Sequence, residues 1–553
     1  MTYSKKQLSQ LVVESCVAFN IEHVIISPGS RNAPLTIGFT NHSKIKTYSV
    51  VDERCAAFFG LGIAQQTQKP VALVCTSGSA LLNYYPAIAE AFYSNIPLII
   101  VSADRPEHMI DIGDGQTIRQ ENVFANHSLF NANLIEDENS LKKNIRLVSN
   151  ALEICIEKNG PVHINVPFDE PLYETTESCR INTIDGKIMS VKKEIDYNLK
   201  DFIDIWNKSA KKIVLIGSHY PDERLEQYLI ELVSDESVLM FTETTSNVHH
   251  PKFINSIDKL IFPLADNDFD KLKPDILLTL GGMIVSKKVK QFLRIHRPKH
   301  HWHLDGENAP DTFHCLTHHF EIKSSSFFSL FLKETKPVKS TYQNYWLTVK
   351  RDRSKKHKQF LEQVVFSDFK VFDIILSKLP NNVHLQLGNS SIIRYAQLFE
   401  NNPTVKVFCN RGTSGIDGST STAIGAAYSS TEQTIFITGD VSFFYDSNAL
   451  WNKYIPSNFR VIVVNNGGGG IFKILPGPQK TEALDYFETP HNLSAEHLCK
   501  MYQLEYKKAT NKEELLYQLE TFFNNSKQPK VLEIFTPNTI NDKVLKNYFK
   551  TIQ

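Results

Sequence analysis

The sequence predicts an α/β fold built from three doubly wound domains with mainly parallel sheets. Three observations predict it: the length of 553 residues, a globular composition with 42% hydrophobic and 22% charged residues, and short apolar runs that alternate with helix-like segments. The length corresponds to about three domains of ~100 to 200 residues each. Strands that alternate with helices pair in parallel and form doubly wound sheets.

The first third contains five short runs rich in Val and Ile, each followed by a turn of small residues. We expect these runs to be strands buried on both faces. They are HVIISPGSR, KTYSVVDER, VALVCTSGSA, PLIIVSADRP and PVHINVP. Between them, residues 80–93 carry apolar side chains at helical spacing. Because open α/β sheets bind ligands at the carboxyl ends of their strands, we expect the chemistry in the SPGSR, VDER, TSGS and SADRP turns.

A polar stretch from Glu174 to Asn198 predicts a linker to a second α/β block. The candidate strands of that block are KKIVLIGS, SVLMFTETT, DILLTLGG and KHHWHLD. The charged stretch from Lys350 to Lys358 predicts a solvated helix face at the next junction.

The last third returns to the pattern of the first. Its candidate strands are NVHLQLGNSS, VKVFCNRGTSG, QTIFITGD, FRVIVVNNGGGG and KVLEIFTP. The chain is therefore expected to form two similar blocks that flank a third one. The predicted domains are residues 1–180, 195–340 and 355–553.

Charge and cysteine content limit the partners and the location. Lys plus Arg and Asp plus Glu number 60 each, so no overall field attracts nucleic acid or an anionic membrane. No apolar run approaches the ~18 residues of a membrane span, and Glu14 interrupts the N-terminal apolar stretch, so we expect neither a span nor a signal peptide. The eight cysteines are dispersed without zinc-type spacing, which favours buried reduced thiols and a cytoplasmic location.

Two strand ends in the last third carry oxygen ligands for a divalent cation. One strand ends in Gly439 and Asp440, and the next ends in Asn465 and Asn466, 26 positions after the carboxylate. Adjacent parallel strands would bring the carboxylate and the amide to one edge. Such hard oxygens suit Mg²⁺, and the glycines at 467–470 let the backbone approach a diphosphate closely. An Asp that caps a helix and an Asn-Gly turn would explain the same residues.

This spacing resembles the thiamin-diphosphate-binding motif, with Val441 where the motif usually has Gly. A thiamin enzyme also needs a carboxyl group bonded to the pyrimidine ring of the cofactor. Glu53 is the candidate because it follows a buried strand and begins an apolar, small-residue helix, where burial would raise its pKa. The alternative is an ordinary glutamate at a helix N-terminus.

Nine segments, in chain order, closely resemble the 2-succinyl-5-enolpyruvyl-6-hydroxy-3-cyclohexene-1-carboxylate synthases, a thiamin-dependent family of menaquinone biosynthesis. They are SPGSRNAPL, DERCAAFFGLGIA, TSGSALLNYYPAIAEA, SADRPE, GQTIRQ, GNSSIIR, NRGTSGIDGSTSTAIGAA, GDVSFFYD and NNGGGGIF. The resemblance implies domains of the thiamin-diphosphate-dependent enzyme type, with thiamin diphosphate and Mg²⁺ (or Mn²⁺) as cofactors. It implies a transferase, or carboligase, that decarboxylates 2-oxoglutarate and adds the resulting succinyl-semialdehyde enamine to isochorismate in a 1,4 sense. It also implies a homodimer or a tetramer of dimers, with active sites at the subunit interface.

The resemblance implies a set of cofactor-binding residues. They are Glu53, Ile416, Gly439, Asp440, Asn466, Gly468, Ile471, Phe472 and Leu475. Glu53 would be the catalytic group, and Ile416 would be the apolar wedge that holds the cofactor bent. Asp440, Asn466 and the backbone carbonyl of Gly468 would bind the metal. The apolar residues after the glycine run would exclude water, although plain core packing explains such residues equally well.

The resemblance also implies substrate-binding residues at the strand ends. They are Ser30, Arg31, Arg105, Gln116, Lys287, Ser390, Arg394 and Arg411. Both substrates are dicarboxylates, which forked arginine donors suit, although a single loop arginine is more often a surface charge. In VSKKVKQF, Lys287 is preferred over Lys288. Gly115 stands where the family often has an amide residue.

Several other hypotheses stay open. Another thiamin carboligase or 2-oxoacid decarboxylase, such as an acetohydroxyacid synthase, would prefer pyruvate to 2-oxoglutarate. A catalytically silent protein would keep the cofactor fold only as a binding module. The histidine-rich stretch HRPKHHWHLDG lacks the spacing of a metal site, and the GGGG run lacks both nucleotide-loop patterns.

Overall fold

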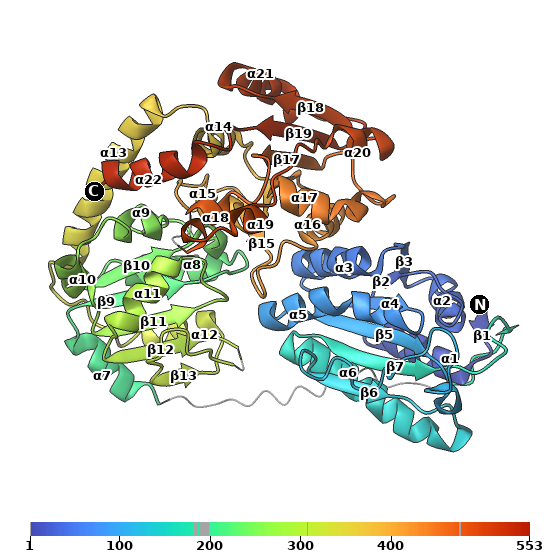
Figure 1. Ribbon diagram of the computed structural model, residues 1–553. Coiled ribbons are helices and arrows are strands. Elements are labelled where there is room, and N and C mark those ends of the chain that lie inside the picture. The colour runs from blue at the N-terminus through green and yellow to red at the C-terminus, as the bar shows by residue number, and fades with distance from the viewer. Residues whose placement is uncertain (1, 182–185, 187–197, 307, 475–476) are drawn as a thin grey trace. The chain divides into compact units, whose positions relative to one another are not determined.

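The computed structural model describes residues 2–181, 186, 198–306, 308–474 and 477–553 (Figure 1). The chain forms two compact units. The first consists of Met1–Lys193, Gly412–Thr431 and Ser442–Phe459, and the second consists of Glu194–Arg411, Glu432–Val441 and Arg460–Gln553.

The first unit contains a six-stranded parallel sheet of order β3-β2-β4-β5-β7-β6 (Figure 1). Its strands are β2 (His23–Ile26), β3 (Lys46–Ser49), β4 (Val71–Cys75), β5 (Leu98–Asp104), β6 (Phe130–Asn133) and β7 (Val162–Pro167). All five predicted runs are strands. The sequence did not predict β6, an edge strand whose residues FNAN contain no apolar run.

Helices and one small antiparallel pair complete the first unit. They are β1 (Tyr3–Ser4), α1 (Gln7–Ala18), α2 (Ala33–Thr40), α3 (Glu53–Thr67), α4 (Ser79–Asn83), α5 (Tyr85–Ser94), η1 (Glu107–Met109), η2 (Glu138–Ser140), α6 (Leu141–Lys158), β8 (Thr175–Thr176), α16 (Ser419–Ser429) and η4 (Ser447–Leu450). The helix predicted over residues 80–93 is two helices that meet at Tyr84, because Pro86 favours a new helix start at this point. Helices α3 and α16 touch through their backbones, since a Cβ on Gly62 would lie 2.1 Å from the Thr422 carbonyl oxygen.

The second unit contains two further parallel sheets. The middle sheet has the order β10-β9-β11-β12-β13, with β9 (Lys212–Ile216), β10 (Val238–Thr242), β11 (Ile276–Leu280), β12 (His300–Leu304) and β13 (His318–Phe320). The third sheet has the order β15-β14-β16-β17-β19-β18, with β14 (His384–Leu387), β15 (Lys406–Cys409), β16 (Thr434–Gly439), β17 (Arg460–Asn465), β18 (Glu505–Ala509) and β19 (Lys530–Phe535). All the predicted strands are present, whereas the edge strands β13 and β18 were not predicted.

The first and third sheets share one topology. If the six strands of each are numbered along the chain, both sheets have the order 2-1-3-4-6-5. The middle sheet has the order 2-1-3-4-5. These orders are doubly wound, with the reversal between the first and third strands. The predicted α/β class, with similar blocks flanking a different one, is confirmed.

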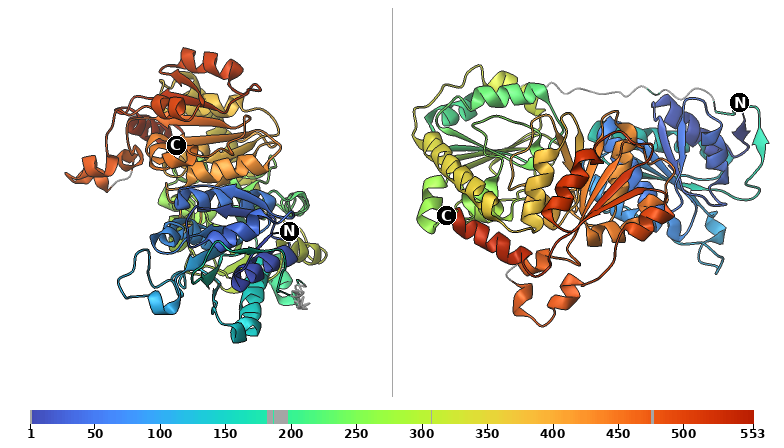
Figure 2. Two further views of the ribbon diagram at one scale, coloured as in Figure 1. Left: turned by 90° about the vertical axis from the view of Figure 1, so that its right-hand side faces the viewer. Right: turned by 90° about the horizontal axis from the view of Figure 1, so that it is seen from above.

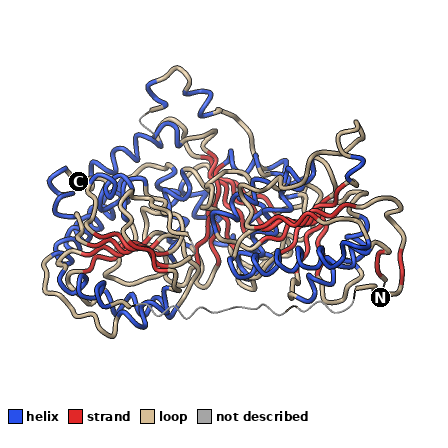
Figure 3. The backbone as a smooth tube through the Cα atoms, turned by 90° about the horizontal axis from the view of Figure 1, so that it is seen from below, coloured by secondary structure: helices blue, strands red, loops and turns tan. Residues whose placement is uncertain are grey.

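Helices cover the sheets of the second unit on both faces (Figures 2 and 3). The helices described in this unit are α7 (Lys200–Lys208), α8 (Glu223–Leu232), η3 (Thr244–Ser246), α9 (Ile257–Ile261), α10 (Asp266–Leu272), α11 (Lys287–Ile295), α12 (Ser324–Phe331), α13 (Tyr342–Gln363), α14 (Asp368–Lys378), α15 (Ser391–Ala396), α18 (Ile471–Ile474), η5 (Pro478–Lys480), α19 (Leu484–Glu488), α20 (Glu496–Met501), α21 (Lys512–Phe522) and α22 (Asn541–Thr551). Helix α17 (Asp440–Tyr445) has residues in both units. Alternate residues of β9 pack on opposite faces of the sheet. Val214 and Ile216 lie in one hydrophobic core, and Ile213 and Leu215 lie in another. This alternation explains why the strand reads as a continuous apolar run.

Other predictions have mixed outcomes. The stretch Lys350 to Lys358 is helical, but Arg353 and His357 are buried, so the face is only partly solvated. All eight cysteines are free, and only Cys179 and Cys315 are not fully buried. Each sheet draws its strands from one of the three predicted domain ranges, although the domain boundaries themselves stay a prediction. Much of the predicted linker lies outside the described residues. Among the helices that are described, none is both long and apolar enough to cross a lipid bilayer.

Candidate active site

The turns after β2, β3, β4 and β5 lie at one edge of the first sheet, because all its strands run in parallel. This edge carries Ser30 and Arg31 after β2, Glu53 after β3 and Arg105 after β5. The expected gathering of these turns is therefore present.

Glu53 is the first residue of α3. Asp52 caps this helix by accepting a hydrogen bond from the Cys55 amide at 3.1 Å. Burial raises the pKa of Glu53, and the Asp52 carboxylate raises it further, whereas its own backbone amide and the Asn83 side chain lower it. The direction agrees with the expectation from sequence. A half-buried carboxyl group of raised pKa at a strand end is suited to exchanging a proton with a ligand.

Arg31 and Arg105 form a pair of cations at the same edge. Arg31 is 5% exposed; it donates to the Phe168 carbonyl at 2.8 Å and pairs with Glu170 at 3.2 Å. Burial lowers the pKa of Arg31, and the charge of Arg105 lowers it further. Two neighbouring cations that repel each other favour an anion nearby.

The segment after η1 contacts Arg105 through its backbone. Arg105 donates to the Gly115 carbonyl at 3.1 Å, so the residue that replaces the family's amide contacts Arg105 through its backbone. Gln116 is exposed and has a φ of 55°. Gln120 fixes this segment, since its Oε1 accepts from the Gly78 amide at 2.9 Å.

A carboxylate of α5 holds the loop that carries Ile416. Glu90 accepts from the amides of Gly412 and Thr413, each at 2.7 Å. The Ile416 carbonyl accepts from the Ser442 hydroxyl at 2.9 Å. Gly418 ends the loop with a φ of +84°, and a Cβ there would lie 2.0 Å from the Phe58 ring. Only glycine therefore fits at this position.

Strands β16 and β17 of the second unit are adjacent and parallel, with Gly439 opposite Val464. Their ends bring Asp440 and Asn466 to one edge, as the spacing predicts. One Asp440 oxygen accepts from the Val441 amide at 2.7 Å, and the other accepts from the Gly468 amide at 3.0 Å. Burial raises the pKa of the Asp440 carboxyl group, and these amides lower it.

The Asn466 side chain has a donor that is satisfied and an acceptor that is not. Its amide nitrogen donates to Asp368 at 3.0 Å, whereas its buried Oδ1 has no hydrogen-bond partner. Asp368 also accepts from the Thr536 hydroxyl at 2.6 Å, which fixes the carboxylate that orients the amide. An orphaned buried oxygen near a carboxylate fits a hard divalent cation.

The glycine run after Asn466 forms the rest of this edge. Gly468 has a φ of 150°, and its carbonyl accepts from the Gly470 amide at 3.0 Å. His491 lies 3.4 Å from the Asp440 carboxylate. Ile471 is buried in α18, and Phe472 stacks on Phe487 with ring centroids 5.5 Å apart. Leu475 lies outside the described residues.

The ends of β14 and β15 bring further predicted residues together. Ser390 precedes α15, and its carbonyl accepts from Arg394 at 2.5 Å. Arg411 follows β15 and donates to the Asn389 side chain at 2.8 Å. Burial lowers the pKa of Arg394, Arg411 lowers it further, and the Asp258 carboxylate raises it. The two arginines therefore belong to one charge cluster.

The lysines of α11 differ in their surroundings. Lys287 is exposed at the first position of the helix. Lys288 lies over the Phe262 ring, with its ammonium 4.7 Å from the centroid, which leaves Lys287 as the less engaged cation. Burial lowers the pKa of Lys290, Arg411 lowers it further, and Glu243 raises it. Sequence analysis did not single out Lys290, although helical spacing places it one turn after Lys287.

Three buried carboxylates of these edges were not found from sequence: Glu90, Glu243 and Asp368. Each bonds to a residue remote in the chain, so no local spacing marks it. Two histidines of the HRPKHHWHLDG stretch bond to a threonine, since Thr279 Oγ1 contacts His301 at 3.0 Å and His303 at 2.8 Å.

Comparison with known proteins gives the class of this fold and site. Residues 6–127 match the family described as "Thiamine pyrophosphate enzyme, N-terminal TPP binding domain". The matched range includes Glu53, Arg31, Arg105 and Gln116. The fold is thus that of an enzyme that depends on thiamine pyrophosphate, which is thiamin diphosphate.

Full-length relatives give the particular family. Proteins named 2-succinyl-5-enolpyruvyl-6-hydroxy-3-cyclohexene-1-carboxylate synthase are 55% identical in Flavobacterium psychrophilum over 100% of both chains, and 37% identical in Porphyromonas gingivalis over 100% of this chain and 98% of the relative. A protein of that name from Desulfotalea psychrophila is 34% identical over 98% of this chain and 100% of its own. The chain belongs to the 2-succinyl-5-enolpyruvyl-6-hydroxy-3-cyclohexene-1-carboxylate synthase family.

Proposed function

We propose that the chain decarboxylates 2-oxoglutarate and adds the remaining four-carbon unit to isochorismate in a 1,4 sense. The products are 2-succinyl-5-enolpyruvyl-6-hydroxy-3-cyclohexene-1-carboxylate and CO₂, in menaquinone biosynthesis. The names of the full-length relatives and the matched domain support this proposal. Among the structural observations, the paired ends of β16 and β17, with Asp440 beside the unpartnered oxygen of Asn466, carry it.

The residues present fit thiamin diphosphate with Mg²⁺ or Mn²⁺. Asp440, Asn466 and the Gly468 carbonyl would hold the metal. At Gly439 a Cβ would meet only Ile392, at 3.9 Å, so the backbone there is open to a diphosphate. When bound, thiamin diphosphate supplies a carbon nucleophile that takes up a 2-oxo acid and releases CO₂. Glu53 would hold and return a proton at the pyrimidine ring, a role that its raised pKa supports.

Apolar residues would shape the same site. Ile416 would hold the bent form of the cofactor, and Ile471, Phe472 and Leu475 would keep water from the reacting carbon. The burial of Ile471 and the stacking of Phe472 support this role.

Cations at the strand ends would bind the two dicarboxylate substrates. The proposed substrate-binding residues are Ser30, Arg31, Arg105, Gln116, Lys287, Ser390, Arg394 and Arg411. Arg31 lies within the electrostatic reach of Arg105, and Arg394 within that of Arg411. Two neighbouring arginines support the binding of an anion with two carboxylates.

The proposed assembly is a homodimer or a tetramer of dimers. Glu53 of one subunit and the metal site of another would serve one cofactor, so each active site would lie at the subunit interface. The eight free thiols support a cytoplasmic location.

Product analysis tests the proposal. The chain is mixed with thiamin diphosphate, Mg²⁺, 2-oxoglutarate and isochorismate, and mass spectrometry is used to look for the adduct of both substrates minus CO₂. Formation of that adduct supports the proposal, and its absence with folded protein contradicts it. Pyruvate in place of 2-oxoglutarate serves as the control substrate, and preferential use of pyruvate would indicate another carboligase.

A further inference from the structure

A buried glutamate holds the turn that precedes α11. Glu243 follows β10 and is 3% exposed. Its carboxylate accepts from the amides of Val285 at 2.6 Å and Ser286 at 2.7 Å, which directly precede Lys287. Two charge-assisted hydrogen bonds to consecutive amides fix the direction in which the chain enters the helix.

A second carboxylate holds the same turn from α9. The Ser286 hydroxyl, which caps α11 through the Val289 amide at 3.1 Å, donates to Asp258. Desolvation raises the pKa of Asp258, whereas Ser286, Arg394 and Lys288 lower it. The turn is therefore fixed both by its backbone and by its one cap side chain.

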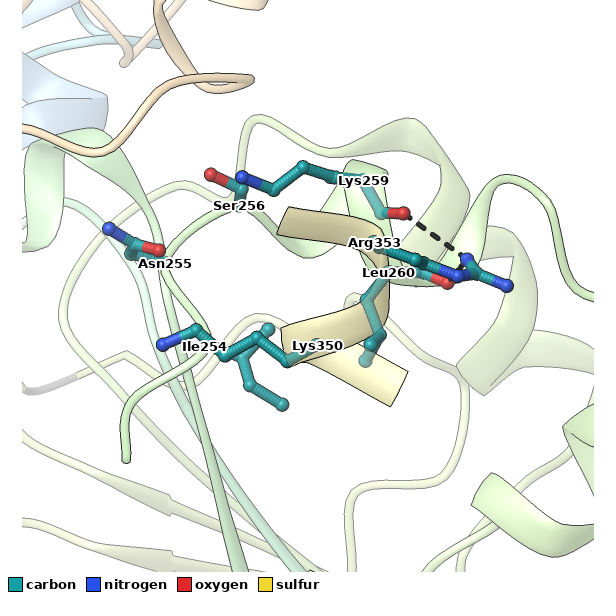
Figure 4. Close-up of a pocket in the computed structure, with 7 residues that line it drawn as sticks. All are labelled: Ile254, Asn255, Ser256, Lys259, Leu260, Lys350 and Arg353. Atoms are coloured by element: carbon teal, nitrogen blue, oxygen red, sulfur yellow. Dashed lines mark hydrogen bonds between the residues drawn. The ribbon is translucent and has the colours of Figure 1, made fainter. Parts of the chain in front are cut away.

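Helix α13 in turn fixes α9. Lys350 donates to the carbonyls of Pro251 at 2.9 Å and Phe253 at 2.8 Å, and Arg353 donates to the carbonyls of Lys259 and Leu260 (Figure 4). The recess between these elements is lined by Ile254, Asn255, Ser256, Lys259, Leu260, Lys350 and Arg353. Its volume of about 10 Å³ holds about one water. These cations therefore tether the main chain and do not form a substrate site.

The held turn belongs to the charge cluster of the strand ends. Burial raises the pKa of Glu243 to about 7, Asp258 raises it further, and the two amides and Arg411 lower it. Glu243 thus lies within the electrostatic reach of a proposed substrate cation while its own hydrogen bonds go to backbone amides. An acid that bonds to backbone can place a neighbouring cation without neutralising it.

We propose that Glu243, supported by Asp258, is a positioning residue that sets where the Lys287 ammonium meets a substrate carboxylate. The inference rests on the proposed function, since that function gives Lys287 its role. Substitution by glutamine leaves one acceptor oxygen for two amides and turns an NH₂ group toward the second amide, so the turn loosens.

A double-mutant cycle tests the inference through steady-state kinetics. Lys287→Met is expected to raise the KM of one substrate. Glu243→Gln is expected to raise the same KM about tenfold, the equivalent of one hydrogen bond to a charged group, with kcat changed less than about twofold. In the Lys287→Met background, Glu243→Gln should have little further effect, because its influence passes through Lys287. An undiminished effect in that background would overturn the inference.

A control and a second measurement separate this inference from the proposed function. Asp235→Asn is the control, since Asp235 lies at the opposite edge of the same sheet and accepts from the Ser237 amide at 2.9 Å and the Val338 amide at 3.1 Å. Asp235 also pairs with buried Lys212 at 3.0 Å, so folding of this variant is checked first by circular dichroism. It should leave both KM values unchanged. Hydrogen exchange measures the turn without any turnover: the amides of residues 285 and 286 should exchange at least about tenfold faster in Glu243→Gln. Unchanged exchange rejects the positioning role, whereas absence of the adduct from the wild-type protein rejects the proposed function alone.

Discussion

Substitution of Asp368 by asparagine is expected to weaken metal binding without destabilising the protein near neutral pH. In the wild-type protein, Asp368 accepts from the Asn466 amide at 3.0 Å, which turns Asn466 Oδ1 toward the proposed metal. An asparagine would present its own NH₂ group to that amide. The Asn466 side chain would then flip and offer a donor to the cation. Loss of such an orienting partner typically weakens metal affinity about 10- to 100-fold.

The stability of the same variant follows from the pKa of Asp368. Burial raises this pKa from 3.8 to about 6, which corresponds to about 3 kcal/mol at 1.36 kcal/mol per pKa unit. Because the pKa of Asp368 is higher in the folded state than in the unfolded state, its contribution to the free energy of unfolding is most favourable below pH ~3.8. This contribution is lost as the pH rises to about 6 and does not return at higher pH. Asparagine cannot ionise, so it removes the cost of burying the charged carboxylate, but it also loses hydrogen bonding worth about 1 to 3 kcal/mol. The variant should therefore be as stable as the wild type or more stable at pH 7.5, and less stable at pH 4.

Two measurements on the protein without cofactor test this prediction. Urea unfolding at pH 4 and pH 7.5 gives the free energies of unfolding, and calorimetric titration with Mg²⁺ and thiamin diphosphate at pH 7.5 gives the affinity. Asp446→Asn is the control, since burial raises the pKa of Asp446 to about 6 as well, but its carboxylate accepts from the Ser421 amide at 2.8 Å in the first unit. The control should show a similar pH trend and unchanged Mg²⁺ affinity. Equal Mg²⁺ affinity in the wild type and Asp368→Asn would refute the orienting role.

Three further substitutions test other parts of the two edges. Gly418→Ala places a Cβ 2.0 Å from the Phe58 ring at a φ of +84°, so it should lower the free energy of unfolding by about 3 kcal/mol. The melting temperature measures this loss, and Gly115→Ala is the control because its Cβ would meet no atom within 4 Å. Glu53→Gln should lower turnover by about 10² to 10⁴ while thiamin diphosphate still binds in calorimetry; undiminished turnover would remove Glu53 from the mechanism. Gly115→Asn should leave stability within about 0.5 kcal/mol and leave the KM values unchanged, because the backbone carbonyl that holds Arg105 remains. A severalfold lower KM would show instead that an amide contact is missing.

The fold was predictable wherever strands are buried on both faces. In the three parallel sheets, the strands that were not predicted are β6, β13 and β18, and all three are edge strands. The two-residue strands β1 and β8 were not predicted either. In β18, with the sequence EYKKA, only Ala509 is buried. An edge strand pairs on one side only and can leave one face in water, so its sequence needs no continuous apolar run. The repeated pattern predicted two similar blocks that flank a third, and the equal strand order of the first and third sheets agrees with it.

The site residues were predictable where they directly follow the carboxyl ends of parallel strands. Asp440 and Asn466 were found because parallel pairing turns a sequence spacing into proximity. The acids that orient the site were not found from sequence. Asp368 lies 98 positions from Asn466, and Glu90 lies 322 positions from the Gly412 amide that it holds. Such pairs leave no periodic or local trace, and each acid alone resembles an ordinary helix glutamate or aspartate.

One physical requirement would account for two of these acids, Glu90 and Glu243. A cation that binds a substrate carboxylate must be placed accurately, and an acid that holds the neighbouring backbone amides can do this without pairing with the cation. Arg31 is placed differently, since it pairs directly with Glu170 at 3.2 Å. In this chain Glu243 bonds to the amides directly before Lys287, and Glu90 bonds to the amides directly after Arg411. In both places the acid fixes the backbone next to the cation. If Lys287 and Arg411 bind substrate as proposed, substituting Glu243 or Glu90 should alter the KM values more than the free energy of unfolding.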